Sequence, residues 1–247
     1  MYRKFQNAVL QGRLIRASYL KLMSIVDWLL SYVLSLPFIK DFIVACFKII
    51  VTSNHEQTRS IDCLWMGTRA NKYPADLWIY SEIIYSTKPD IIIECGTDRG
   101  GTTTFLASLC DLFGNGSVIS IDVESVKRPQ HPRIQYLHGS STQKEITGIF
   151  EDQINSAKNV LVILDSDHSK EHVLNELRLY SKFIKRGNYL IVEDTLLNGH
   201  PVLNSFGPGP MEAVNEFLLE NKDFIVDKNC EKFLMSLNPR GYLMRVR

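Results

Sequence analysis

The sequence predicts an α/β fold in which helices flank a mostly parallel central sheet and a helical extension comes first. Two observations predict it. Short apolar segments alternate with stretches of helical spacing, and strands separated by helices form parallel sheets through crossover connections. Each apolar segment is followed by polar or acidic residues, as expected where ligands bind beyond the carboxyl ends of parallel strands. The expected strands are one that begins at Ile91, then 117–121, 133–137, 159–164 and 189–192.

The composition fits one α/β domain with an appendage. The chain has 247 residues, of which 45% are hydrophobic and 22% are charged, and this is enough to bury a full core. Its 28 basic and 27 acidic residues nearly balance, which argues against a nucleic-acid-binding protein, because such proteins concentrate positive charge. Five cysteines without a C-x-x-C pair suggest neither a disulfide framework nor a zinc site. A reducing cytosol is therefore the expected compartment.

The charge is unevenly distributed, and this divides the chain into an extension, 1–53, and a main domain, 54–247. Residues 1–50 hold seven basic and two acidic side chains, whereas the remainder holds 21 basic and 25 acidic ones. The extension is therefore basic, and it is also strongly apolar.

The apolar part of the extension is interrupted. The run 22–38 contains Asp27 and Pro37, and the second run, 42–51, is shorter than the ~20 residues that a bilayer requires. Three alternatives stay open. The segment forms helices packed on the main domain or on another subunit, or a basic amphipathic anchor at a membrane surface, or a membrane span.

The first elements of the main domain are a helix at 76–87, whose apolar residues recur at helical spacing, and the strand at Ile91. Three consecutive isoleucines predict a strand that is buried on both faces. The next helix is expected at 103–113 and ends at Gly114-Asn115-Gly116, a strong turn signal.

The turn between this strand and helix is typical of a nucleotide-type cofactor site. Gly96, Gly100 and Gly101 permit a sharp turn and close approach of a ligand to the backbone. Glu94 stands where an acid commonly binds a ribose or a ligand ammonium group, and Thr97 lies in the turn. Free N–H groups at the start of the next helix suit an anionic group. Glycine-rich turns also occur without any ligand, so the motif alone is not decisive.

The second and third strands end at two further polar positions. Asp122 is placed to accept hydrogen bonds from both hydroxyls of a ribose, or else to cap the following helix. Gly139, Ser140 and Ser141 border an adenine or simply form a loop.

The fourth and fifth strands end in acids, Asp165 and Asp167 after one and Glu193 and Asp194 after the other. Carboxylates crowded at one sheet edge repel one another unless a cation or proton intervenes, and Mg²⁺ with oxygen ligands resolves that conflict. The preferred ligands are Asp167, Glu193 and Asp194, with Asp165 as the competitor for the first place. The alternative is that some of these acids cap helices and the others face solvent.

Two further features adjoin the acids. His168 is a metal ligand, a base or a hydrogen-bonded residue at a helix start. The segment 206–210 is rich in glycine and proline and precedes a helix from about Met211, so it forms either a lid over the substrate or a stiff loop.

Five motifs in the second half of the chain resemble a known family. They are 164–173 (LDSDHSKEHV), 191–195 (IVEDT), 199–202 (GHPV), 206–214 (FGPGPMEAV) and 238–243 (NPRGYL). Together they resemble the cephalosporin hydroxylase and rhamnosyl O-methyltransferase family, and the similarity runs from about Asn71 to the C-terminus. The resemblance implies a Rossmann-like class I methyltransferase fold, the cofactor S-adenosylmethionine, and Mg²⁺ held by an Asp and a Glu-Asp pair.

The function implied is O-methylation of a hydroxyl on a sugar, such as a deoxysugar of a glycolipid, or on another natural product. His168, His200 and Asp167 are the catalytic candidates. The expected cofactor-binding residues are Glu94, Gly96, Thr97, Gly100, Gly101, Asp122, Ser140 and Asp165. The expected partners are a small-molecule or glycolipid acceptor and a second copy of the chain, with a peripheral membrane contact through residues 1–50 if the extension is an anchor.

Two alternatives of other classes stay open. One is a metal-dependent natural-product hydroxylase, although the His-x-Asp and distant His of a facial iron triad are absent from the sequence. The other is a non-catalytic partner protein of a biosynthetic complex, against which the intact acids argue.

Overall fold

The structure is a computed structural model, and it describes residues 21–33, 36, 39, 42–43, 46, 63–233 and 235–247. The chain separates into two compact units, 1–50 and 51–247. The expected boundary between 53 and 54 falls close to this division.

Within the first unit, residues 21–33 form a helix. Most of the expected extension, 1–53, lies outside the described residues, and so does most of the segment expected to contact a membrane. Among the residues that the structure describes, no helix has both the length and the apolar character needed to cross a bilayer.

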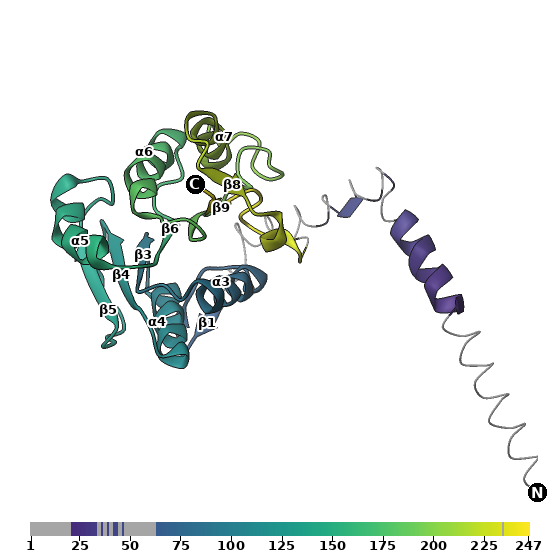
Figure 1. Ribbon diagram of the computed structural model, residues 1–247. Helices are drawn as coiled ribbons and strands as arrows, with labels where there is room; N and C mark the ends of the chain where they lie inside the picture. Colours follow the sequence, from purple (N-terminus) through teal and green to yellow (C-terminus); the bar gives the residue numbers. More distant parts are fainter. Residues whose placement is uncertain are drawn as a thin grey trace, which may run out of the picture. The chain divides into compact units, whose positions relative to one another are not determined.

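The second unit is built on a seven-stranded sheet in the order β5-β4-β3-β6-β7-β9-β8 (Figure 1). The strands are β3 (Ile91–Cys95), β4 (Ser117–Asp122), β5 (Ile134–His138), β6 (Val160–Leu164), β7 (Tyr189–Val192), β8 (Phe224–Val226) and β9 (Tyr242–Arg245). The first five pair in parallel, whereas β9 is antiparallel to both β7 and β8. The expectation of a mostly parallel sheet is confirmed.

Helices cover both faces of this sheet (Figure 1). They are α3 (Pro74–Thr87), α4 (Gly101–Phe113), α5 (Lys144–Ser156), α6 (Lys170–Tyr180) and α7 (Pro210–Glu220). Buried side chains of α5, α6 and α7 share one core cluster, and those of α3 and α4 share another. The fold is therefore three layers with the sheet in the middle.

Strand β3 shows why its sequence is apolar on both faces. Its alternate residues Ile91, Ile93 and Cys95 pack in the core with α5 to α7, while Ile92 packs with α3 and α4. Successive side chains of a strand point to opposite faces. A strand in the middle of a three-layer fold therefore needs apolar residues on both of its faces.

The parallel strands fix the place of the site. The chain goes from β3 to β4 and β5 on one side and then returns to β6 on the other side of β3. Loops that leave two adjacent strands in opposite directions open a crevice at their carboxyl ends, and ligands bind there.

A hairpin that was not expected precedes α3. It consists of β1 (Leu64–Trp65) and β2 (Thr68–Arg69), joined at Met66 and Gly67, which both have positive φ angles, 48° and 82°. Such angles are those of a tight two-residue hairpin turn. The hairpin packs against α4, where the Trp65 ring meets Phe105 edge-on.

Candidate active site

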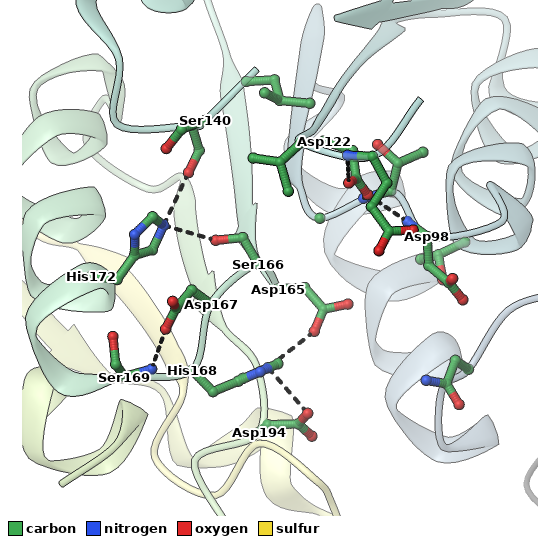
Figure 2. Close-up of a pocket in the computed structure, with 18 of the residues that line it drawn as sticks. Asp98, Asp122, Ser140, Asp165, Ser166, Asp167, His168, Ser169, His172 and Asp194 are labelled. Atoms are coloured by element: carbon green, nitrogen blue, oxygen red, sulfur yellow. Dashed lines mark hydrogen bonds and ion pairs between the residues drawn. The ribbon is translucent and has the colours of Figure 1, made fainter. Parts of the chain in front are cut away.

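A cavity of about 910 Å³ opens at the carboxyl ends of the parallel strands. Its wall includes Gly96 and Thr97 after β3, Asp122 at the end of β4, and residues that follow β5, β6 and β7. Figure 2 shows side chains from these loops pointing toward the same space. The predicted convergence of polar residues at one sheet edge therefore occurs.

The glycines of the first turn serve packing as well as access. Gly96 has φ +94°, and a Cβ at this position would lie 1.9 Å from the carbonyl oxygen of Asp165. A Cβ on Gly101 would lie 2.0 Å from the carbonyl oxygen of Arg69 in the hairpin. Gly96 and Thr97 line the cavity, whereas Gly100 and Gly101 do not. The last two glycines therefore position α4 and the turn instead of forming the cavity wall.

Glu94 lies beneath the turn and not in the cavity. Its side chain is buried, and its Oε2 accepts hydrogen bonds from the hydroxyls of Thr103 at 2.5 Å and Ser120 at 2.6 Å. Burial raises the pKa of Glu94 to about 7, although the two hydroxyls oppose the shift. In this structure Glu94 thus contacts groups of the protein core, and its expected contact with a cofactor stays a prediction.

Asp122 lines the cavity and holds the glycine turn in place. One carboxylate oxygen accepts the backbone N–H groups of Thr97 and Asp98, both at 2.8 Å, and the other accepts that of Glu124 at 2.7 Å. Arg128 Nη2 lies 3.3 Å away. The structure therefore shows Asp122 organising the loop at the wall of the cavity.

A polar cluster that was only partly expected forms the wall beyond β5 and β6. The hydroxyls of Ser141 and Ser166 donate to Glu176 Oε1 at 2.5 and 2.7 Å, and His172 Nε2 lies 3.1 Å from the Ser166 hydroxyl (Figure 2). Glu176 is fully buried on α6. Ser140, the expected neighbour of an adenine, lies on the same wall. The i, i+4 spacing of His172 and Glu176 on one helix is the signal that could have indicated this cluster.

Asp165, His168 and Asp194 form the acidic end of the cavity. One ligand-type atom from each lies within 4.8 Å of the others. His168 Nε2 is 3.1 Å from Asp194 Oδ2 and 3.5 Å from Asp165 Oδ1 (Figure 2). Burial would lower the pKa of His168, but the two carboxylates outweigh it and raise the pKa to about 10.

This trio suits a hard divalent cation. The Nε2 atom of His168 is itself buried and finds no hydrogen bond of acceptable geometry within the described part of the chain. Two carboxylates and an unsatisfied imidazole nitrogen thus face one point. Carboxylate oxygens are the ligands that Mg²⁺ prefers.

Two of the three preferred metal ligands lie elsewhere. Asp167 turns to the start of α6, where its Oδ1 accepts the Ser169 N–H at 2.7 Å, and hydrogen bonding to Ser169 lowers the pKa of Asp167. Glu193 is 1% exposed, receives the hydroxyl of Tyr80, and lies 3.0 Å from Lys72. Asp165, the competitor for the first place, is therefore the aspartate that lies beside His168 and Asp194 in the structure, and the choice of metal ligands stays a prediction.

His200 is also placed away from the reacting space. Its Nε2 lies 2.7 Å from Glu212 Oε1 on α7, and it is not part of the cavity wall. Of these two catalytic candidates, His168 lines the cavity and His200 does not, and the identity of the base stays a prediction. Asp167 contributes to the cavity wall, and its Oδ1 accepts the N–H of Ser169, the residue that precedes α6.

The segment 206–210 forms one wall of the cavity through Phe206, Gly207 and Pro208. It is tied to its surroundings, because the Pro208 carbonyl accepts the Lys170 N–H at 3.0 Å and the Gly209 N–H donates to Glu212 at 2.7 Å. These bonds favour the stiff-loop alternative over a lid that moves freely.

Lys72 is the residue that the sequence reasoning missed. It precedes α3, its side chain is 4% exposed, and its ammonium contacts both Asp165 and Glu193. Nothing in the spacing Lys72-Tyr73-Pro74 distinguishes it from a surface lysine before a helix.

Comparisons with known proteins show the family. The family model described as Rhamnosyl O-methyltransferase/CmcI matches residues 57–246. Proteins named rhamnosyl O-methyltransferase from Mycobacterium tuberculosis strain H37Rv and Mycobacterium leprae strain TN are each 36% identical to this chain. The matches cover 73% of this chain and 77% or 82% of those proteins.

Solved structures show the same fold. The apo-structure of CmcI has a TM-score of 0.58 and 22% sequence identity, and the match covers 75% of this chain and 76% of that chain. A second structure of CmcI, described as containing Mg and SAM, has a TM-score of 0.55 and 22% identity and covers 75% and 77%. The Rossmann-like class I methyltransferase fold is thus confirmed, and so is the expected resemblance. The chain belongs to the Rhamnosyl O-methyltransferase/CmcI family of O-methyltransferases.

Proposed function

We propose that this protein transfers the methyl group of S-adenosylmethionine to a hydroxyl of a sugar and that Mg²⁺ assists the transfer. One observation carries the proposal. The trio Asp165, His168 and Asp194 faces the same cavity as the glycine turn and Asp122. A site for a nucleoside-type cofactor and a site for a divalent cation are therefore adjacent.

The cofactor would be held by the turn after β3 and by the loops after β4 and β5. Gly96 and Thr97 offer their backbone, Asp122 adjoins the ribose position, and Ser140 and Ser141 adjoin the base. When bound, S-adenosylmethionine supplies a sulfonium methyl group that is already activated. The protein's task is then to align the acceptor oxygen with that methyl group.

Asp165 and Asp194 would hold the metal ion, with His168 beside them. A bound Mg²⁺ lowers the pKa of an acceptor hydroxyl that it contacts. His168 is the candidate base. Asp165 and Asp194 raise the pKa of its imidazole. A cation bound to these carboxylates would cancel their effect, and the imidazole could then accept the hydroxyl proton at Nε2.

The acceptor is proposed to be a sugar hydroxyl because the curated relatives are named for a rhamnosyl acceptor. The cavity fits this class. Phe206 and Pro208 contribute apolar groups to its lining, and Arg69, Asn71 and Asp98 contribute polar groups. Sugars present one apolar and several polar faces, so a mixed lining suits them.

Association with a membrane and with a second copy of the chain are also part of the proposal. The support is the sequence of residues 1–50, which is apolar and carries an excess of five positive charges. A glycolipid acceptor presented at an anionic membrane surface would suit such a segment.

Methyl transfer to a sugar panel tests the function. The purified protein is incubated with S-adenosylmethionine and sugar acceptors that include a rhamnoside, and S-adenosylhomocysteine is measured by mass spectrometry. We expect acceptor-dependent product, lost in EDTA and restored by Mg²⁺. His168→Ala is expected to lower the rate by about 10²-fold or more.

The matched control is His131→Ala. His131 pairs with Asp111 at 3.1 Å and lies outside the cavity wall. The methyl-transfer rate of this variant is therefore expected to stay within about twofold of the wild type. Product formation that EDTA does not change would refute the metal, and the absence of any methylated sugar would refute the acceptor class.

A further inference from the structure

The floor beneath the acidic trio contains a buried lysine. Lys72 is 3% exposed, and its Nζ contacts Asp165 Oδ2 and lies 3.0 Å from Glu193 Oε1. Asp165 itself belongs to the proposed metal site, and Glu193 shares the ammonium of Lys72 with it. A single ammonium thus joins a residue of the metal site to a buried acid.

Burial of these acids is costly without a cation. Glu193 is 1% exposed, and within the described part of the chain Lys72 is its ion-pair partner. The Tyr80 hydroxyl adds a hydrogen bond to Glu193 but no charge. A carboxylate buried without a compensating charge is strongly unfavourable, and removing one partner of a buried pair destabilises the protein.

Backbone hydrogen bonds also hold the segment that carries Glu193 and Asp194. Asn238 Oδ1 accepts the backbone N–H of Asp194 at 2.9 Å, and the backbone N–H of Glu193 donates to the Leu164 carbonyl at 2.9 Å. These bonds fix the backbone at the ends of β6 and β7, from which the three acids extend. Lys72 adds a cation that contacts Asp165 Oδ2 and Glu193, while His168 lies beside the other oxygen of Asp165.

We propose that Lys72 is a positioning residue that occupies the cation position between Asp165 and Glu193, so that a divalent ion must compete with its ammonium for Asp165. This inference rests on the proposed metal site. Lys72 keeps the acids convergent before the ion arrives, and it weakens the binding of the ion, because a fixed positive charge next to a divalent cation repels it.

A purely structural lysine makes a different prediction. If Lys72 only balanced Glu193 and did not act on Asp165, its removal would lower the stability of the protein without changing the affinity for metal. Metal affinity therefore separates the two roles.

The experiment uses Mn²⁺ as the probe and measures free Mn²⁺ by electron paramagnetic resonance during titration of the full chain. Lys72→Met is expected to bind Mn²⁺ about tenfold more tightly than the wild type, or tighter still. Lys182→Met is the matched control, because it also removes one lysine charge, from an exposed ion pair with Glu151. Its Mn²⁺ affinity is expected to equal that of the wild type.

A second pair of variants covers the case in which Lys72→Met does not fold. Glu193→Gln and the double variant Lys72→Met with Glu193→Gln both lack the buried carboxylate at position 193. Removing the lysine from the double variant therefore leaves no unpaired carboxylate at that position. The double variant is expected to bind Mn²⁺ about tenfold more tightly than Glu193→Gln alone, because Lys72 still competes for Asp165 in the single variant.

The outcomes separate this inference from the proposed function. Mn²⁺ binding by the wild type with equal or weaker binding by the Lys72→Met proteins would overturn the inference and leave the metal site standing. Failure of every folded variant to bind Mn²⁺ would overturn the metal site, and the inference with it.

Discussion

Replacing Gly96 by alanine tests whether the acidic site depends on the close backbone contact between the glycine turn and the end of β6. The new Cβ would lie 1.9 Å from the Asp165 carbonyl oxygen, 2.5 Å from its carbonyl carbon and 3.0 Å from Ser166 Cα. All three are backbone atoms, so no side-chain rotation relieves the contact. The turn and the end of β6 must therefore move apart.

The magnitude follows from two contributions. The positive φ of 94° costs a residue with a Cβ about 1–3 kcal/mol, and displacing packed backbone adds about 1–3 kcal/mol. The sum, about 2–6 kcal/mol, is a large part of the ~5–15 kcal/mol that stabilises a typical domain. For a protein of this size it corresponds to a fall in Tm of roughly 10 °C.

Gly148→Ala is the matched control. Gly148 lies inside α5, and a Cβ there meets nothing within 4 Å. Alanine is favoured over glycine in a helix interior, so this variant is expected to gain about 0.5–1 kcal/mol.

Urea unfolding followed by circular dichroism measures both variants, and a titration with Mn²⁺ shows whether displacement of Asp165 also weakens metal binding. A Gly96→Ala protein within about 1 kcal/mol of the wild type, with unchanged Mn²⁺ binding, would refute the reasoning.

Three further predictions concern the aspartates after β6, the buried Glu94, and His200. Asp165→Asn is expected to weaken Mn²⁺ binding by about 10²-fold, whereas Asp167→Asn changes it less than about threefold, and equal effects in a Mn²⁺ titration would contradict the assignment. Glu94 has a pKa raised from 4.5 to about 7 by burial, so its contribution to stability is complete below pH ~4.5 and is lost, by about 3 kcal/mol, as pH rises through 7. Glu94→Gln should therefore flatten the dependence of the urea midpoint between pH 5 and pH 8, and an unchanged slope would count against this origin. His200→Ala should lower Tm by removing the contact to Glu212 while methyl transfer stays within about tenfold of the wild type, and a loss beyond that would restore His200 as a catalytic candidate.

The parallel part of the sheet could be predicted because each strand combines an apolar run with a clear turn. The isoleucines of β3 are the best example, since their burial on both faces requires helices on both sides. The antiparallel strands β8 and β9 were missed, because β8 has three residues and β9 has four and their pairing depends on contacts between distant segments. Such short runs carry little periodicity.

The candidate site could be predicted as an edge of the sheet but not atom by atom. Asp165 and Asp167 both follow β6 and both line the cavity, and only the structure shows that Asp165 lies beside His168 whereas Asp167 accepts the Ser169 N–H. Lys72 could not be predicted, because its contact with Asp165 joins residues 93 positions apart. The burial of Glu94 could not be predicted for a related reason, since its partners Thr103 and Ser120 come from two other elements.

The most direct test of the central claim is a calorimetric titration of the purified protein with S-adenosylmethionine, in Mg²⁺ and in EDTA. No acceptor is needed, so a wrong choice of sugar does not affect the result. Saturable binding with one site per chain, lost in Asp122→Ala because the turn is no longer held, is the result predicted. A wild-type protein that is folded by circular dichroism and binds no S-adenosylmethionine would contradict the account.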